Sequence, residues 1–195
     1  MKEVIVSNAL NIFAIKGYYG TSMSDVSKSV DLHKSSLYNY FKSKGEIFEA
    51  CIEKCLQKAC NHIESFDFTD DTNKDHFFNF LYKFIFDDIN YVRFYFQMSF
   101  SPECHKEIIF YWKDKLNKTK NKKLKLILEF LGFDRLFDDF RININNFING
   151  WLTSYIFSGY YDDINTLKKE FIIHFEIFNQ SLVRKIESEF NLKID

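Results

Sequence analysis

The sequence is poor in the residues that interrupt helices. Of 195 residues, only one is proline (Pro102) and six are glycine. Both residue types break helices, so their scarcity favours long helices. No alternation of apolar and polar residues is long enough to predict a strand, and no internal repeat is visible. We therefore expect an all-α fold.

Cysteines and long apolar stretches are also scarce. Four cysteines in a chain of this length are too few for a disulfide framework, which indicates a reducing compartment. Apolar runs are short and interrupted by charge, so no segment is predicted to span a membrane. The first residues, Met1-Lys2-Glu3-Val4, carry an acid and polar positions where a signal peptide would be apolar. These features predict a cytoplasmic protein.

The sequence patterns of common catalytic sites are missing as well. We find no nucleophile–base motif, phosphate-binding loop, paired-carboxylate signature or metal motif. The prediction is that the protein is not an enzyme and needs no cofactor.

Apolar residues are abundant, at 46% of the chain, and aromatic residues reach 19%, which is ample material for a packed core. Charge is unevenly distributed. Residues 1–45 hold six lysines and three acids, a balance of +3. The whole chain carries −1, so residues 46–195 carry −4. A small basic segment attached to a mildly acidic body favours localised contact with phosphate groups.

The N-terminal segment begins with an amphipathic helix. Val6, Ala9, Leu10 and Phe13 have the spacing of one helical face. Gly17 follows where a C-terminal cap is expected.

Two short helices come next. Ser22 stands three residues before Asp25, a weak capping signal that opens the first of them. Asp31 interrupts the pattern, and aspartate tolerates the left-handed backbone of a tight turn. The second of these helices places Leu37 and Phe41 inward, at i and i+4.

A long fourth helix is predicted to start at a capping box formed by Ser43 and Glu46. Its inward positions are Ile47, Phe48, Cys51, Cys55 and Ile63.

Three short helices within about 45 residues, the last two joined by a tight turn, match a helix-turn-helix. The third helix has a polar outward face. Ser35 and Ser36 are small enough to approach base edges in the major groove. Its flanks carry donors suited to phosphates, namely Lys34, Tyr38, Tyr40 and, in the first turn of the next helix, Lys44.

The order and spacing of these residues closely resemble the N-terminus of TetR/AcrR-family regulators over residues 1–50. The resemblance is carried by Ala9-Leu10, Phe13-Ala14, Lys16-Gly17-Tyr18, the run TSMSDV at 21–26 and the run KSSLYNYFKSKGEIF at 34–48. Two positions depart from the family pattern. Asp31 replaces the usual glycine of the turn, and His33 replaces a serine-like cap, which leaves the recognition helix less rigid.

The resemblance implies a homodimer that binds a double-stranded operator with two half-sites. It also implies an inducer pocket in the helical body. Ser22 and Ser24 would contact phosphate, and Lys34, Ser35 and Ser36 would face bases or the nearby backbone. The remaining implied contacts are to phosphates, with a base as a second partner for Asn39, and they come from Tyr38, Asn39, Tyr40 and Lys44.

Residues 1–45 are predicted to form the DNA-binding domain, and residues 46–195 a helical domain for ligand binding and dimerisation. One long helix is expected to cross the boundary. Further helices are predicted over 75–98, 103–118, 121–131, 138–158 and 163–190. The pocket is expected between the fourth helix and residues 75–131, lined by Phe84, Tyr91, Phe94, Tyr95, Met98, His105, Phe110 and Tyr111.

The dimer interface is predicted on the last two helices, which are apolar on more than one side. Such a helix needs a second partner besides its own core. Ile172, Ile173 and Ile177 lie off the main apolar stripe. The predicted interface residues are Ile148, Trp151, Leu152, Tyr155, Phe171, Phe175, Phe178 and Leu182.

The functional prediction is a transcriptional regulator, a repressor released from its operator by a small ligand. The supply of aromatic residues favours a lipophilic ligand. One alternative is an architectural or constitutive DNA-binding protein without an inducer. Another is a thiol- or metal-responsive regulator that uses Cys51 and Cys55, although both also fit as small buried residues of an amphipathic helix. The lysine-rich stretch from Lys113 to Lys125 is interpreted as a solvated helix face.

Overall fold

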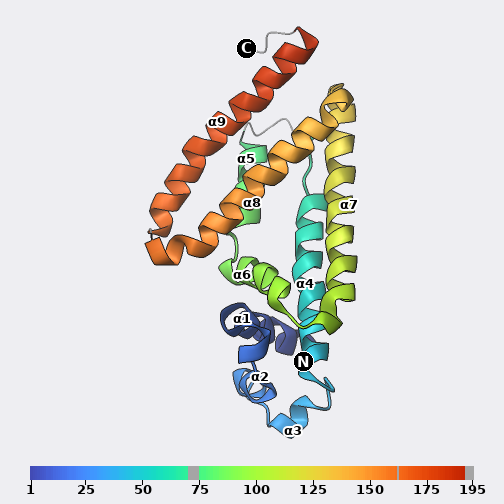
Figure 1. The fold of residues 1–195 in the computed structure, drawn as a ribbon, viewed down its shortest axis with the longest axis vertical. Coiled ribbons are helices and arrows are strands. Elements are labelled where there is room, and N and C mark those ends of the chain that lie inside the picture. The colour runs from blue at the N-terminus through green and yellow to red at the C-terminus, as the bar shows by residue number, and fades with distance from the viewer. Residues whose placement is uncertain (70–74, 162, 192–195) are drawn as a thin grey trace. The chain divides into compact units, whose positions relative to one another are not determined.

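The computed structural model describes residues 1–69, 75–161 and 163–191, with the backbone alone for 158–161. Within these ranges every regular element is a helix, as expected (Figure 1). None of the described helices combines the length and apolar character needed to cross a membrane. The α-helices are α1 (Lys2–Gly20), α2 (Met23–Ser29), α3 (Lys34–Leu37), α4 (Lys44–Glu64), α5 (His76–Phe86), α6 (Ile89–Gln97), α7 (Lys106–Leu131), α8 (Phe137–Tyr161) and α9 (Ile164–Phe190). Short 3-10 helices are η1 (Met98–Phe100), η2 (Glu103–His105) and η3 (Asp134–Leu136).

The chain forms two compact units. The first comprises Met1–Ser65 and Asp88–Thr119, and so contains α1 to α4, α6 and the N-terminal part of α7. The second comprises Phe66–Asp87 and Lys120–Asp195, and so contains α5, the rest of α7, α8 and α9. The unit that holds the predicted DNA-binding segment therefore continues well past residue 45.

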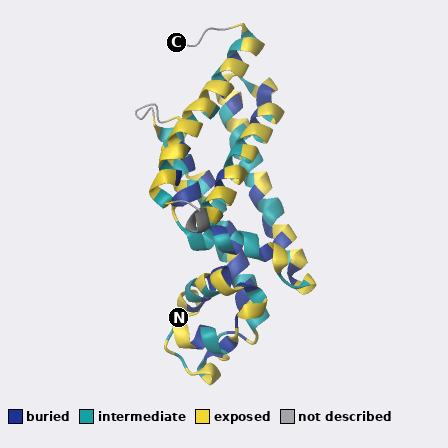
Figure 2. Ribbon diagram, turned by 60° about the vertical axis from the view of Figure 1, so that its left-hand side comes forward, coloured by how far each residue is buried: buried dark blue, intermediate teal, exposed yellow. Residues whose placement is uncertain are grey.

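Three aromatic rings from three helices form the centre of the first unit. Phe13 of α1 lies 5.0 Å from Phe48 of α4, measured between ring centroids, and Phe94 of α6 lies 5.4 Å from Phe48. All three side chains are fully buried. Buried and exposed positions alternate along the helices as amphipathic packing requires (Figure 2). The predicted apolar face of α1 (Val6, Ala9, Leu10, Phe13) is buried as expected.

The end of α1 depends on Gly17. Its φ of +67° lies in the left-handed region and kinks the helix where a C-terminal cap was expected, whereas the last residue of α1 is Gly20. A Cβ at this position would stand only 3.1 Å from Oε1 of Gln97, at the end of α6. Glycine thus serves both the kink and the close approach of α6.

The turn between α2 and α3 is closed at Asp31, whose φ is +52°. The Leu32 amide donates to the Ser27 carbonyl (2.9 Å) and the Asp31 amide to the Lys28 carbonyl (3.3 Å). This pair of bonds is a Schellman motif with aspartate at the left-handed position. The expectation that Asp31 takes the conformation usual for glycine is therefore confirmed.

The second unit has its own aromatic core between α5, α8 and α9. Trp151 of α8 and Phe86 of α5 both pack edge-on against Phe171 of α9, with ring centroids 5.1 and 5.2 Å apart. A separate apolar cluster lies towards the C-terminal end of α9 and contains Leu128, Leu136, Phe140, Leu182 and Ile186.

Two predicted helix boundaries were wrong. The segment 75–98 is two helices, because the Asp88 side chain accepts a hydrogen bond from the Asn90 amide (2.9 Å) and caps the start of α6. Residues 106–131, by contrast, form one helix where a break near residue 120 was expected. It ends in a Schellman motif at Gly132 (φ +77°), where the Phe133 amide donates to the Leu128 carbonyl (2.7 Å).

We predict that Asp31→Gly stabilises the protein. A non-glycine residue in the left-handed region is strained, and an acid at the end of a helix opposes the helix dipole, so its removal should raise the free energy of unfolding by about 0.5–1 kcal/mol. Gly132→Ala is the matched reverse substitution and should lower it by about 1 kcal/mol. Urea denaturation followed by circular dichroism measures both. A lower urea midpoint for Asp31→Gly would contradict the assignment of strain to this turn.

Candidate nucleic-acid interface

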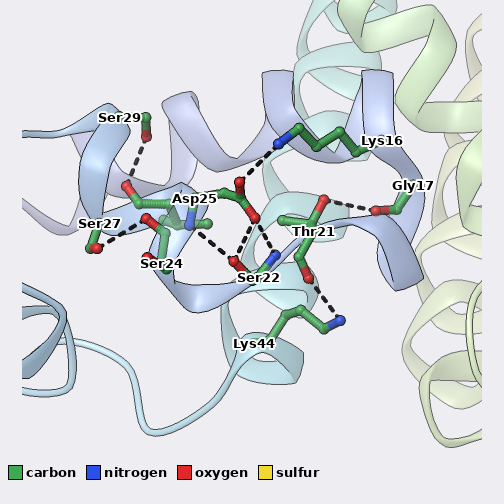
Figure 3. Close-up of polar contacts among 10 residues, drawn as sticks. Lys16, Gly17, Thr21, Ser22, Ser24, Asp25, Ser27, Ser29 and Lys44 are labelled. Atoms are coloured by element: carbon green, nitrogen blue, oxygen red, sulfur yellow. Dashed lines mark hydrogen bonds and ion pairs between the residues drawn. The ribbon is translucent and has the colours of Figure 1, made fainter.

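The start of α2 is held by a complete capping box (Figure 3). The Asp25 amide donates to Ser22 Oγ (3.1 Å), and the Ser22 amide donates to Asp25 Oδ2 (2.8 Å). Lys16 Nζ donates to Asp25 Oδ1 (2.8 Å) and so ties α1 to α2. The Lys16 ammonium, and then the Ser22 hydroxyl and amide, hold the pKa of the Asp25 carboxyl well below its usual range. The capping box that the sequence indicated only weakly is therefore present with both of its hydrogen bonds.

The capping box predicted for α4 is present in part. Ser43 Oγ accepts from the Glu46 amide (3.2 Å). The Glu46 carboxylate, however, accepts from the amide of Lys42 (2.6 Å), one residue before the expected partner. This bond fixes the chain between α3 and α4, which connects residues 34–41, the recognition segment, to the helices that follow.

The recognition segment exposes its polar side and buries its apolar side. Leu37 and Phe41 point into the core of the first unit, with exposed fractions of 0% and 5%. Ser36 and Tyr40 are half-buried. The exposed members of the predicted set are Ser22, Lys34, Ser35, Tyr38 and Asn39.

α3 itself is short. It spans one turn, and residues 38–40 continue as turns rather than as regular helix. Its N-cap, His33, makes no side-chain capping bond, as expected. The side chains predicted to read bases therefore lie on a segment whose helix has no side-chain cap.

Lys44 has a role that the sequence did not reveal. Its ammonium donates to the carbonyl oxygens of Tyr18 (2.8 Å) and Thr21 (2.9 Å) and lies 4.2 Å from the centre of the Tyr18 ring. Two of its three N–H groups are thus engaged within the protein, where they join the start of α4 to the end of α1. Figure 3 shows the contact with Thr21. The available signal was the general attraction between a cation and the free carbonyls at a helix end.

The predicted ligand-lining residues are dispersed. Phe94 and Met98 are buried in the core of the first unit, and Tyr91 and Tyr95 are half-buried on α6. Phe110 and Tyr111 are 75% and 61% exposed. Phe84 belongs to the second unit, whereas His105 packs among Tyr18 and Phe48 of the first.

Several predicted dimer-interface residues already pack within their own chain. Trp151, Phe171 and Leu182 are buried in the two clusters of the second unit, and Phe175 packs against the first of these clusters. Phe178 stacks on Phe147, with ring centroids 4.2 Å apart. Ile148, Leu152 and Tyr155 pack against the same cluster as Phe175. The stripe chosen from the sequence is therefore the one that holds α8 and α9 to their own unit.

The cysteines of α4 pack as small apolar residues. The Cys51 thiol donates to the Val6 carbonyl (3.4 Å) and the Cys55 thiol to the Tyr91 carbonyl (3.7 Å). Burial raises the pKa of both thiols, which disfavours the reactive thiolate. Within the described residues, no group of three or more His, Cys, Asp or Glu side chains is placed to hold a metal ion.

Many of the lysines of α7 have partners. Lys115 donates to Gln57 (3.2 Å), and Lys123 donates to the Phe66 carbonyl (2.6 Å). Lys118 pairs with Asp114 (2.6 Å) on the same helix. These contacts support the interpretation of this run as an ordinary helix surface.

Comparisons with known proteins agree with this geometry. The family model described as "Bacterial regulatory proteins, tetR family" matches residues 5–51. The chain is 31% identical, over 88% of its length and 92% of the relative's, to the biofilm operon icaADBC HTH-type negative transcriptional regulator IcaR of Staphylococcus aureus. It is 33% identical, with the same coverages, to IcaR of Staphylococcus epidermidis. A transcriptional regulator from Aquifex aeolicus shares the fold with a TM-score of 0.66 and 21% identity, over 90% of this chain and 98% of that one.

A helix-turn-helix with a capped α2 and an exposed polar recognition segment, together with these matches, identifies a DNA-binding transcriptional regulator. The family match and the extent of the similarity to IcaR show that the chain belongs to the TetR family.

Proposed function

We propose that the protein is a homodimeric repressor that acts in the cytoplasm and leaves its operator when a small ligand binds. The observation that carries the proposal is the exposed polar face of the recognition segment, set on a buried apolar side in a chain that is 31% identical to IcaR. The name of IcaR describes a negative regulator of a biofilm operon. Negative control of such an operon is therefore the first function to test for this chain.

Residues 1–45 are assigned to DNA reading. Lys34, Ser35 and Asn39 are exposed on the recognition segment, and we assign them to contacts with bases or the adjacent backbone. Ser36, which is half-buried on the same segment, is assigned with them to bases or the adjacent backbone. The remaining proposed contacts are to phosphates, from Ser22, Ser24, Tyr38, Tyr40 and Lys44. Ser22 and Lys44 also stabilise the fold of residues 1–45, so a substitution at either would change both stability and DNA affinity.

The test begins with selection of genomic fragments by the purified wild-type protein, which yields an operator duplex. We predict that Lys34→Ala weakens binding to this duplex and to random DNA alike and lowers the salt slope of log Kd by about one. Asn39→Ala should instead relax discrimination at one base pair, at a cost of about 1–3 kcal/mol.

Lys122→Ala is the control, because it removes the same charge from an exposed position on α7 and should leave the slope unchanged. If fluorescence anisotropy titrations give Lys34→Ala the same salt slope of log Kd as wild type, this lysine does not contact DNA phosphate.

The ligand site is proposed in the first unit, around the half-buried Tyr91 and Tyr95 of α6. Lys58 lies over the Tyr91 ring (4.1 Å) and Lys113 over the Tyr95 ring (5.3 Å), so both rings already face cations. A thermal-shift screen of small molecules, followed by operator release with each hit, tests this part. A regulator that no ligand releases would favour the constitutive DNA-binding alternative.

Dimerisation is proposed through the outer face of α9. Ile173 and Ile177 are one helical turn apart and 58% and 60% exposed, and Ile172 beside them is 46% exposed. Such a row of isoleucines is costly to leave in water, and a second copy of the same helix offers a matching apolar face under two-fold symmetry. An operator with two half-sites requires two linked heads.

We predict that Ile177→Glu gives monomers and abolishes tight operator binding, because a charge without a partner is costly to bury in an apolar interface. Asn179→Glu adds the same charge to an exposed position away from the Ile173–Ile177 row and should remain dimeric. Analytical ultracentrifugation distinguishes the two. Dimers of Ile177→Glu with wild-type operator affinity would place the interface elsewhere.

A further inference from the structure

A buried histidine lies beside the DNA-reading head. His105, the last residue of η2, is 4% exposed. Its ring centroid is 5.1 Å from that of Tyr18, near the end of α1, and 5.2 Å from that of Phe48 of α4. All of these residues belong to the first unit. One side chain therefore contacts two of the helices that support the recognition segment.

The imidazole makes one hydrogen bond and leaves its other nitrogen unused. Nδ1 lies 2.9 Å from Oε1 of Glu49, and because a carboxylate only accepts, Nδ1 carries the proton and donates. Nε2 has no hydrogen-bond partner among the residues that the structure describes. A phenyl ring would fill the same space without burying an unpaired nitrogen, so packing alone does not account for a histidine here.

The ring also lies against the backbone at the start of α4. A Cβ on Gly45 would stand 3.1 Å from Cε1 of His105, closer than most such contacts, so the ring packs tightly against this part of the backbone. The preceding residue, Lys44, holds the carbonyls of Tyr18 and Thr21. His105, Gly45 and Lys44 thus meet at the single helical turn that connects the recognition segment to the rest of the first unit.

We propose that His105 and Glu49 form a positioning clamp: their hydrogen bond fixes the first turn of α4, and with it residues 34–41, in the orientation that reads bases. The clamp rests on the DNA-binding function proposed above and touches no DNA itself. Its effect is confined to specific binding, because base contacts need an accurate orientation, whereas phosphate contacts tolerate a looser one.

The test compares four variants by their affinity for the selected operator duplex and for random DNA. His105→Phe keeps the ring and removes the donor. Glu49→Ala removes the acceptor, whereas Glu49→Gln keeps an amide oxygen that accepts. Glu53→Ala, at an exposed acid one turn further along α4, is the control. Urea midpoints report the stability of each variant.

We expect His105→Phe and Glu49→Ala to bind the operator about tenfold more weakly, which corresponds to one hydrogen bond. Their affinities for random DNA should stay within about twofold of wild type. The double variant should be no weaker than either single one, because both remove the same bond. Glu49→Gln and Glu53→Ala should bind like wild type. If His105→Phe fails to fold, the comparison of Glu49→Ala with Glu49→Gln tests the proposal.

Wild-type operator affinity for His105→Phe and Glu49→Ala would overturn the clamp. So would a loss that is equal on operator and random DNA and follows a lower urea midpoint, because it would indicate a merely structural role. A wild-type protein that prefers no sequence at all would instead overturn the proposed function, and the clamp with it.

Discussion

The packing of α1 against α4 and α6 is the constraint on which the rest of the first unit depends. Phe13, Phe48 and Phe94 bring these helices together in one aromatic contact that is closed to water. The contact spans residues far apart in the sequence, so residues 1–45 cannot complete their core on their own. A displacement of α6 should therefore shift α1 as well, because close-packed side chains transmit strain.

Polar contacts add to this apolar core in fixing the start of α4. Lys44 satisfies carbonyls at the end of α1, and His105 bonds Glu49 one turn into α4. Hydrogen bonds in a dry environment are directional, and leaving one partner unpaired is costly. The start of α4 is consequently fixed by both apolar and polar contacts, whereas α3 is short and lacks a side-chain cap at His33. Orientation of the recognition segment comes from its supports more than from its own helix.

Local features were predictable from the sequence, and long-range contacts were not. The left-handed turn at Asp31 and the kink at Gly17 follow from side chains or backbone freedom within a few residues. The partners of Lys44 and His105 lie 23 to 56 residues away, so no local pattern could identify them. On α9 the sequence showed apolar residues on two sides but not which side faces the chain's own core. The structure buries Phe171 there and leaves the outer isoleucines exposed.

Residues 1–45 and α6 should unfold as one cooperative unit, which native-state hydrogen exchange tests directly. Amides of α1 around Phe13 and of α6 around Phe94 should exchange with the same opening free energy and the same dependence on urea, because both require loss of the shared aromatic core. If the α1 amides exchange through a separate opening of lower free energy while α6 stays protected, the head folds independently and the account is wrong.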